Sequence, residues 1–108
     1  MKSNTNYIST TLIQLVPNTR YRFSCSIKRT GNHPGIGARL FCLYHDGRKS
    51  FVDVYIGYKK EGPTNVWEKF EAEFTTPEID VPHQILLNNA GKSPETVWFD
   101  DVRIEEVK

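Results

Sequence analysis

This chain has little cysteine, no long hydrophobic run and no excess of charge of one sign. Only Cys25 and Cys42 occur in its 108 residues, far fewer than a small disulfide-stapled scaffold carries. The 14 basic and 13 acidic side chains leave a formal net charge of +1, so no overall field attracts nucleic acid or an anionic membrane surface. No apolar run approaches the roughly 20 residues of a membrane helix. We therefore expect neither nucleic acid nor a membrane as partner.

The start of the chain, MKSNTNYIST, has no apolar segment of the kind that forms the centre of a signal peptide. The chain as given is therefore expected either to be cytosolic or to be a piece of a larger protein. Its length and its 38% hydrophobic residues fit one globular domain over residues 1–108.

What the sequence does contain is a sustained two-residue periodicity. Apolar residues recur at every second position and are mostly aromatic or β-branched, whereas the three-and-four spacing of a helix is not sustained. Loops rich in glycine and proline separate the alternating segments. The strands expected on this basis cover residues 7–15, 19–28, 38–45, 50–58, 66–76, 83–90 and 96–107. This pattern predicts an all-β fold, an antiparallel β-sandwich or jelly roll.

The alternation also predicts which side chains face the core. In the clearest strand, residues 19–28, one face carries the apolar side chains Tyr21, Phe23, Cys25 and Ile27. Trp67, which opens a later strand, is also expected in the core. Near the C-terminus the adjacent Asp100 and Asp101 interrupt the alternation, and this break predicts a β-bulge.

Few residues suggest catalysis. His33, His45 and His83 have no shared metal-ligand spacing and are interpreted as surface histidines. The two cysteines have no CxxC spacing, so they are interpreted either as small buried hydrophobes or as one cross-strand disulfide. Glycoside hydrolysis needs two carboxylates across a cleft, one of them with a raised pKa, whereas most acidic residues here fall on outward strand positions. We therefore do not expect an enzyme.

Asp100 and Asp101 are the exception among the acidic residues, because Phe99 and Val102 flank them. A carboxylate in an apolar strand must be hydrogen-bonded, ion-paired or bound to a cation, and hard oxygen ligands favour calcium. Two interpretations stay open, a structural acid held by hydrogen bonds and a calcium ligand.

Three segments occur in an order that is typical of one group of proteins. They are VPNTRYRFSCSIK at 16–28, VWEKFEAEFTTP at 66–77 and ILLNNAGKSPETVWFDDVRIEE at 85–106. With these segments the chain resembles, from about Leu15 onward, the carbohydrate-binding modules of the family four, nine and twenty-two group, which are small jelly-roll domains. The features that match are the Pro-Asn turn before Tyr21-x-Phe23-Ser24, Trp67 with the ending Phe74–Pro77, and the closing Phe99–Val102.

The resemblance implies a non-catalytic module that holds a parent glycan-active enzyme on a polysaccharide or oligosaccharide, as part of a secreted or cell-surface protein. It also implies a structural calcium whose ligands include Asp100 or Asp101. Members of the group usually begin with a further strand and loop, which this chain lacks, so the first strand is expected to be absent or replaced. The sheet edge left exposed predicts pairing with another copy into a homodimer.

Modules of this group usually grip sugar on a concave sheet face. A pyranose ring stacks its apolar C–H face on an aromatic ring, and its hydroxyls need planar polar partners. The candidate stacking residues are Phe41, Tyr44, Tyr55, Tyr58 and Trp98, and the candidate hydrogen-bonding residues are Arg22, Arg39, Asp53, Gln84 and Asn88. Trp98 is the first choice among the rings, because it alternates with the apolar Val97 and Phe99.

A second function from another class stays open, a structural or protein-interaction β-sandwich without a sugar site. The two differ in whether Trp98, Tyr55 and either Phe41 or Tyr44 lie exposed on a single concave face or are instead buried or covered by a neighbour.

Overall fold

The computed structural model describes residues 2–3, 7–8, 12–42, 52–89 and 94–108. These residues form eight strands and no helix, so none of the described chain is a helix able to cross a membrane. The strands are β1 (Lys2–Ser3), β2 (Tyr7–Ile8), β3 (Arg20–Arg29), β4 (Ile36–Cys42), β5 (Asp53–Ile56), β6 (Glu68–Thr75), β7 (His83–Asn89) and β8 (Val97–Glu106). The expected all-β fold is confirmed.

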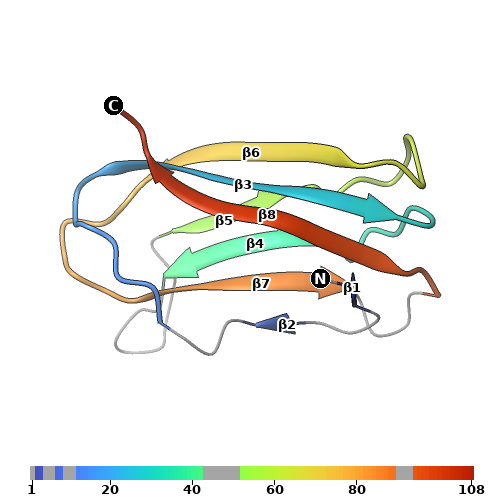
Figure 1. The fold of residues 1–108 in the computed structure, drawn as a ribbon. Coiled ribbons are helices and arrows are strands. Elements are labelled where there is room, and N and C mark those ends of the chain that lie inside the picture. The colour runs from blue at the N-terminus through green and yellow to red at the C-terminus, as the bar shows by residue number, and fades with distance from the viewer. Residues whose placement is uncertain (1, 4–6, 9–11, 43–51, 90–93) are drawn as a thin grey trace.

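The strands build two antiparallel sheets that stack as two layers (Figure 1). The β3 sheet has the order β1-β8-β3-β6, and the β4 sheet has the order β2-β7-β4-β5. Because the chain passes repeatedly from one sheet to the other, strands far apart in sequence become neighbours, such as β3 with β8 and β4 with β7. Each sheet face is therefore assembled from distant segments.

The core lies between the two sheets and follows the two-residue period. The inward side chains of β3 and β4 are buried, as are those at the start of β8: Tyr21, Phe23, Cys25, Ile27, Ile36, Ala38, Leu40, Cys42, Val97 and Phe99. Full burial of a side chain such as Phe23 or Leu40 contributes about 1.5 to 3 kcal/mol as an upper estimate. The predicted inward face of residues 19–28 is thus confirmed.

Two expectations about the strands are wrong. Within the expected strand 7–15, β2 covers Tyr7–Ile8, residues 9–11 lie outside the described residues, and residues 12–15 form no strand but only an isolated bridge from Ile13 to His83. Trp67 does not belong to the core, because its side chain is 50% exposed. The reason is its position in the alternation, since Phe70 packs against the core and Trp67 falls three residues before it.

The predicted bulge in the C-terminal strand is present. The register of β3 with β8 shifts between Ser24 and Ser26, opposite Asp101 and Val102. Asp101 has a φ of 53°, the left-handed conformation that a bulge residue often adopts and that aspartate tolerates better than most side chains.

One end of the sandwich contains a buried arginine. Arg29, the last residue of β3, is 1% exposed, and burial lowers the pKa of its guanidinium. Its Nη2 donates to the carbonyl of Gly57 at 2.8 Å, and its guanidinium carbon lies 5.7 Å from the ring centre of Phe70. Arg29 thereby ties β3 to the segment that follows β5 in the other sheet.

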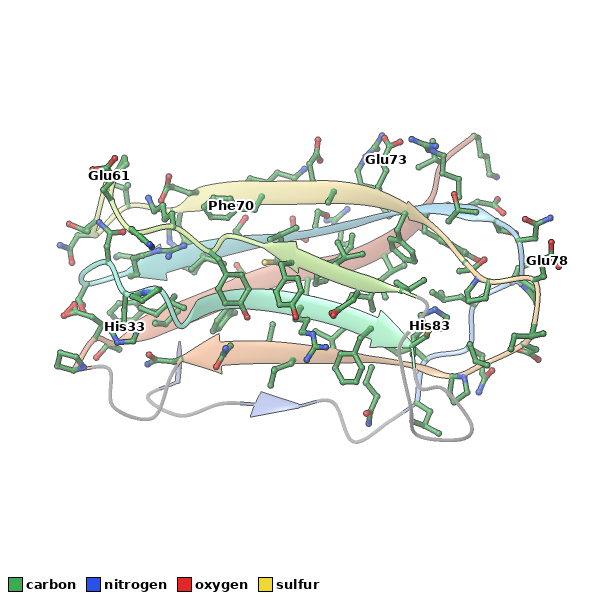
Figure 2. All side chains as sticks on the ribbon, turned by 180° about the vertical axis from the view of Figure 1, so that it is seen from behind. His33, Glu61, Phe70, Glu73, Glu78 and His83 are labelled. Atoms are coloured by element: carbon green, nitrogen blue, oxygen red, sulfur yellow. The ribbon has the colours of Figure 1, made fainter. Side chains whose placement is uncertain are left out.

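The structure shows the surroundings of one histidine and of both cysteines. His83 is not a surface histidine, because it is 1% exposed and its ring centre lies 6.5 Å from that of Phe74. It lies at the end of the sandwich that carries Glu78, opposite the end with His33 and Glu61 (Figure 2). Cys25 and Cys42 are both buried and free, so the interpretation as small buried hydrophobes holds. His45 lies outside the described residues.

Candidate functional site

Seven of the predicted ligand-binding residues gather on or beside the outer face of the β4 sheet, the face that points away from the β3 sheet. The inward positions of β4 are Ile36, Ala38, Leu40 and Cys42, so the alternate positions face outward. The register with β5 and β7 then aligns the outward residues of all three strands. The seven are Phe41, Arg39, Asp53, Tyr55, Tyr58, Gln84 and Asn88.

Arg39 and Asp53 form a bidentate ion pair in the middle of this face. The Arg39 Nε lies 2.5 Å from Asp53 Oδ1, and its Nη2 donates to Oδ2 at 3.1 Å. The hydrogen bond to Asp53 raises the pKa of Arg39 above its ordinary value. Tyr55 donates its hydroxyl to the same Oδ2 at 3.2 Å. The charges of the pair balance each other, so this part of the face carries fixed dipoles with no net charge.

Two aromatic rings flank the arginine. The guanidinium carbon of Arg39 lies 4.7 Å from the ring centre of Phe41 and 5.2 Å from that of Tyr55. Tyr55 is 55% exposed, whereas Phe41 is half-buried. Contacts between a guanidinium and a ring are favourable, and here they fix the orientation of both rings relative to the sheet.

Tyr58 extends this aromatic surface toward β7. Its ring meets the edge of Tyr55, with the ring centres 5.6 Å apart at 67°. Its hydroxyl accepts a hydrogen bond of 3.3 Å from Asn88 Nδ2, and burial raises its pKa. A Cβ at Gly37 would lie 2.4 Å from the Tyr58 ring, so only glycine leaves room for the ring on β4. Sequence reasoning missed Gly37, although its place between two apolar residues at a strand start marks a close approach.

The other predicted residues are not part of this face. Trp98 and Arg22 lie on the outer face of the β3 sheet, where Trp98 pairs with Lys28 in the register of β8 and β3. Arg22 Nη2 bonds Glu73 Oε2 at 3.0 Å, and Arg20 Nε bonds the other oxygen of Glu73 at 2.7 Å. The expected grouping of Trp98 with Tyr55 and Phe41 on one face is therefore wrong. Tyr44 lies outside the described residues.

Asp100 and Asp101 each make a contact within β8, and the calcium that the resemblance implies stays a prediction. Both side chains are exposed. Asp101 Oδ1 pairs with Arg103 Nε at 2.5 Å, and Asp100 Oδ1 accepts the backbone N–H of Asp101 at 2.9 Å. Within the described ranges no group of three His, Cys, Asp or Glu side chains could hold a metal ion. The hydrogen-bonded structural acid is the interpretation that these contacts support.

Comparisons with known proteins relate the chain to others through its fold. No protein-family model and no curated protein matches the sequence. A family 4 carbohydrate-binding module superposes with a TM-score of 0.66 at 19% identity, over 94% of this chain and 61% of that one. Family 16 carbohydrate-binding module 2 superposes with a TM-score of 0.67 at 19% identity, over 95% of this chain and 73% of that one.

A third similar structure is larger. It is the N-terminal part of the endo-1,4-β-D-xylanase 10B of Clostridium thermocellum, whose CBM22-1 and GH10 modules are complexed with xylohexaose. The TM-score is 0.61 at 18% identity, over 87% of this chain and 18% of the xylanase chain. The chain spans about three fifths of the length of the family 4 structure. These likenesses establish that the chain has the β-sandwich fold of carbohydrate-binding modules.

Proposed function

We propose that this chain is a non-catalytic module that binds a polysaccharide on the outer face of the β4 sheet. The observation that carries the proposal is the cluster of Phe41, Arg39, Asp53 and Tyr55, in which two rings flank a neutral ion pair. The fold likeness to three carbohydrate-binding module structures, one of them complexed with xylohexaose, supports the same ligand class.

The chemistry of the cluster suits a sugar. The exposed ring of Tyr55 offers a flat apolar surface to the C–H face of a pyranose. The guanidinium of Arg39 donates and the carboxylate of Asp53 accepts, so hydroxyls on the edge of the sugar ring find both kinds of partner. Gln84 and Asn88 extend the polar rim along β7, opposite Phe41 and Gly37.

The binding is expected to be of modest strength. On an open sheet face, sugar hydroxyls exchange hydrogen bonds with water for hydrogen bonds with protein at little net gain. Dissociation constants of roughly micromolar to millimolar follow, so linkage to a second binding or catalytic unit would raise the effective affinity. We propose on this ground that the module acts within a larger secreted or cell-surface protein, joined to a glycan-active enzyme.

Affinity electrophoresis tests the proposal. The protein is run in separate gels that contain soluble xylan, mixed-linkage β-glucan, mannan or a uronate polymer. At least one of the neutral polysaccharides is expected to retard it. Tyr55→Ala removes the exposed ring and is expected to weaken the retardation severalfold, whereas Tyr55→Phe keeps the ring and most of the binding. Circular dichroism checks that both variants fold.

Two results would contradict the proposal. The first is an unchanged mobility in every polysaccharide. The second is a retardation that neither Tyr55→Ala nor Phe41→Ala alters. The first outcome would favour a structural or protein-interaction β-sandwich, whereas the second would place the sugar-binding surface on another part of the molecule.

A further inference from the structure

A second aromatic surface lies on the opposite side of the molecule, on the outer face of the β3 sheet. It contains Trp67 and Trp98, the two tryptophans of the chain. Lys28 of β3 pairs with Trp98 of β8, and Ile27 pairs with Glu68 of β6. If the antiparallel register of β3 with β6 is continued by one residue beyond Ile27 and Glu68, Trp67 lies beside Lys28. The two tryptophans therefore stand two strand spacings apart, about 10 Å, with Lys28 between them.

Both rings present apolar surface at this end of the face. Trp67 is 50% exposed. Trp98 is half-buried, and Lys28 Nζ lies 5.4 Å from its ring centre. A cation beside an aromatic ring at a solvated site contributes only about 0.5 to 1 kcal/mol. The long lysine side chain can therefore move off the ring at little cost when a ligand stacks there.

The rows beside the tryptophans are polar and balanced in charge. Ser26 of β3 lies between Lys69 of β6 and Asp100 of β8. In the next row Ser24 lies between Glu71 and Arg103. Each row carries one side chain of each sign around a short hydroxyl, so hydrogen-bond donors and acceptors alternate across the face without a net charge.

This composition fits a glycan better than a protein partner. A specific protein interface buries about 800 Å² on each side and keeps charged residues out of its centre. Here the aromatic part consists of Trp67 and Trp98, and the adjacent rows are charged. A sugar chain needs only ring surface for stacking and dispersed polar groups for its hydroxyls. In the rows of Ser26 and Ser24 an acid accompanies each base, so these rows do not attract an anionic chain, and Lys28 is the one charged side chain in the row of the tryptophans.

We propose that Trp67 and Trp98 form a second binding surface for a neutral polysaccharide. The two rings take pyranose units of one chain, and Ser26, Lys69 and Asp100 hydrogen-bond the hydroxyls beside them. This inference rests on the proposed function, since it gives the second face the same class of ligand as the β4 sheet. A module with binding surfaces on opposite faces holds two polysaccharide chains, or two segments of one chain, at once.

Tryptophan fluorescence tests this surface separately, because both tryptophans lie on it and the other face carries none within the described residues. Titration with xylohexaose or a soluble β-glucan oligosaccharide is expected to change the emission. Tyr55→Ala is expected to leave that change and its dissociation constant within twofold of wild type. Calorimetry is expected to give two ligands per chain for wild type. It is expected to give one for Tyr55→Ala and one for the double variant Trp67→Ala with Trp98→Ala.

The outcomes separate this inference from the proposed function. The second surface is overturned if the tryptophan emission does not change on titration and calorimetry gives one bound ligand whose binding Tyr55→Ala abolishes. This result leaves the proposed function intact. A response to uronate polymers alone overturns the neutral ligand class. Failure of both proposals would appear as no binding of any glycan by wild type. Trp67→Ala alone serves as the second variant if the double variant does not fold, because Trp67 lies outside the core.

Discussion

In the proposed sugar site, Arg39 is the side chain that is expected to decide which sugars the β4 sheet accepts. A guanidinium binds a free carboxylate through two parallel hydrogen bonds, and Asp53 already occupies the Nε and Nη2 of Arg39. A uronate arriving at this face would have to displace a carboxylate of the same sheet and would face its repulsion. In the proposed site the pair is therefore expected to select against anionic glycans.

The variant Asp53→Asn is expected to relax this selection. An amide cannot hold both nitrogens of the arginine and carries no charge, so Arg39 becomes available to a uronate. The affinity for a uronate polymer, measured from the retardation, is expected to rise about tenfold, which is equivalent to about 1.4 kcal/mol of binding free energy. The affinity for neutral polysaccharides is expected to fall or to stay unchanged. Asp80→Asn is the matched control, because it makes the same change in net charge at an exposed loop position. An equal effect of both variants would mean that net charge alone is responsible.

His83 is expected to make the fold sensitive to acid. Its burial lowers the pKa of the imidazole below the ordinary value, whereas in the unfolded chain the pKa is about 6.5. The unfolded state therefore binds the proton first, and stability falls as the pH decreases from about 6.5 toward the folded-state pKa, by at most about 1.4 kcal/mol per pH unit. Thermal unfolding between pH 5 and pH 8 measures this slope. His83→Leu should flatten it and His33→Gln should not, and equal slopes for all three proteins would refute the assignment.

At the scale of the elements, the turn after β5 depends on Gly57. Its φ is +79°, and a Cβ there would lie 2.5 Å from Ile27 Cδ1. The buried Arg29 also bonds its carbonyl. This glycine therefore combines a backbone conformation that other residues resist with a close approach to the core.

Gly57→Ala is expected to destabilise the fold by roughly 2 kcal/mol, from the positive φ and the clash together. Gly62→Ala is the control, since its φ is also positive, +123°, but its nearest neighbour would be the flexible Lys59 at 3.0 Å. Chemical denaturation should show a clearly larger loss for Gly57→Ala. Equal losses would mean that the contact with Ile27 adds nothing to the backbone strain.

The sequence predicts the elements well because their signal is local. Alternation alone locates β3, β6, β7 and β8 to within two residues and gives the inward face of β3. The same rule predicts an outward Trp67, so the expectation of a buried Trp67 contradicts the alternation of its own strand. The surface interpretation of His83 is wrong for a related reason, since it rests on the missing metal-ligand spacing, whereas His83 shares the parity of Ile85 and Leu87 on β7.

The sheet to which a strand belongs has no local signal. Trp98 and Tyr55 both alternate with buried residues, so in sequence both mark an outer face. Only the long-range pairing of β8 with β3 and of β5 with β4 separates them onto opposite sides of the molecule. For this reason the composition of the candidate site was predictable for seven residues, while the separation of Trp98 and Arg22 from them was not.

At the scale of the whole molecule, the sheet edges bear on association. β6 ends the β3 sheet and β5 ends the β4 sheet. The outward side chains of β6 include Lys69, Glu71 and Glu73, and charge on an edge strand opposes pairing with another chain. The homodimer stays a prediction. Light scattering at high micromolar concentration should give the mass of two chains if it forms, and a mass near 12.5 kDa would exclude it.

The two free cysteines lie in different parts of the core. Cys25 faces inward from the middle of β3 within the main cluster, whereas Cys42 packs with Val52 and Val81 at the end of β4. Burial raises the pKa of Cys25 to about 12, so its thiol is almost wholly protonated at neutral pH and does not react in the closed sandwich. A thiol reagent can modify these residues only when the layers separate. The rate at which a thiol reagent labels Cys25 therefore measures how often the centre of the sandwich opens. The labelling rate of Cys42 measures independently how often one end of the sandwich opens.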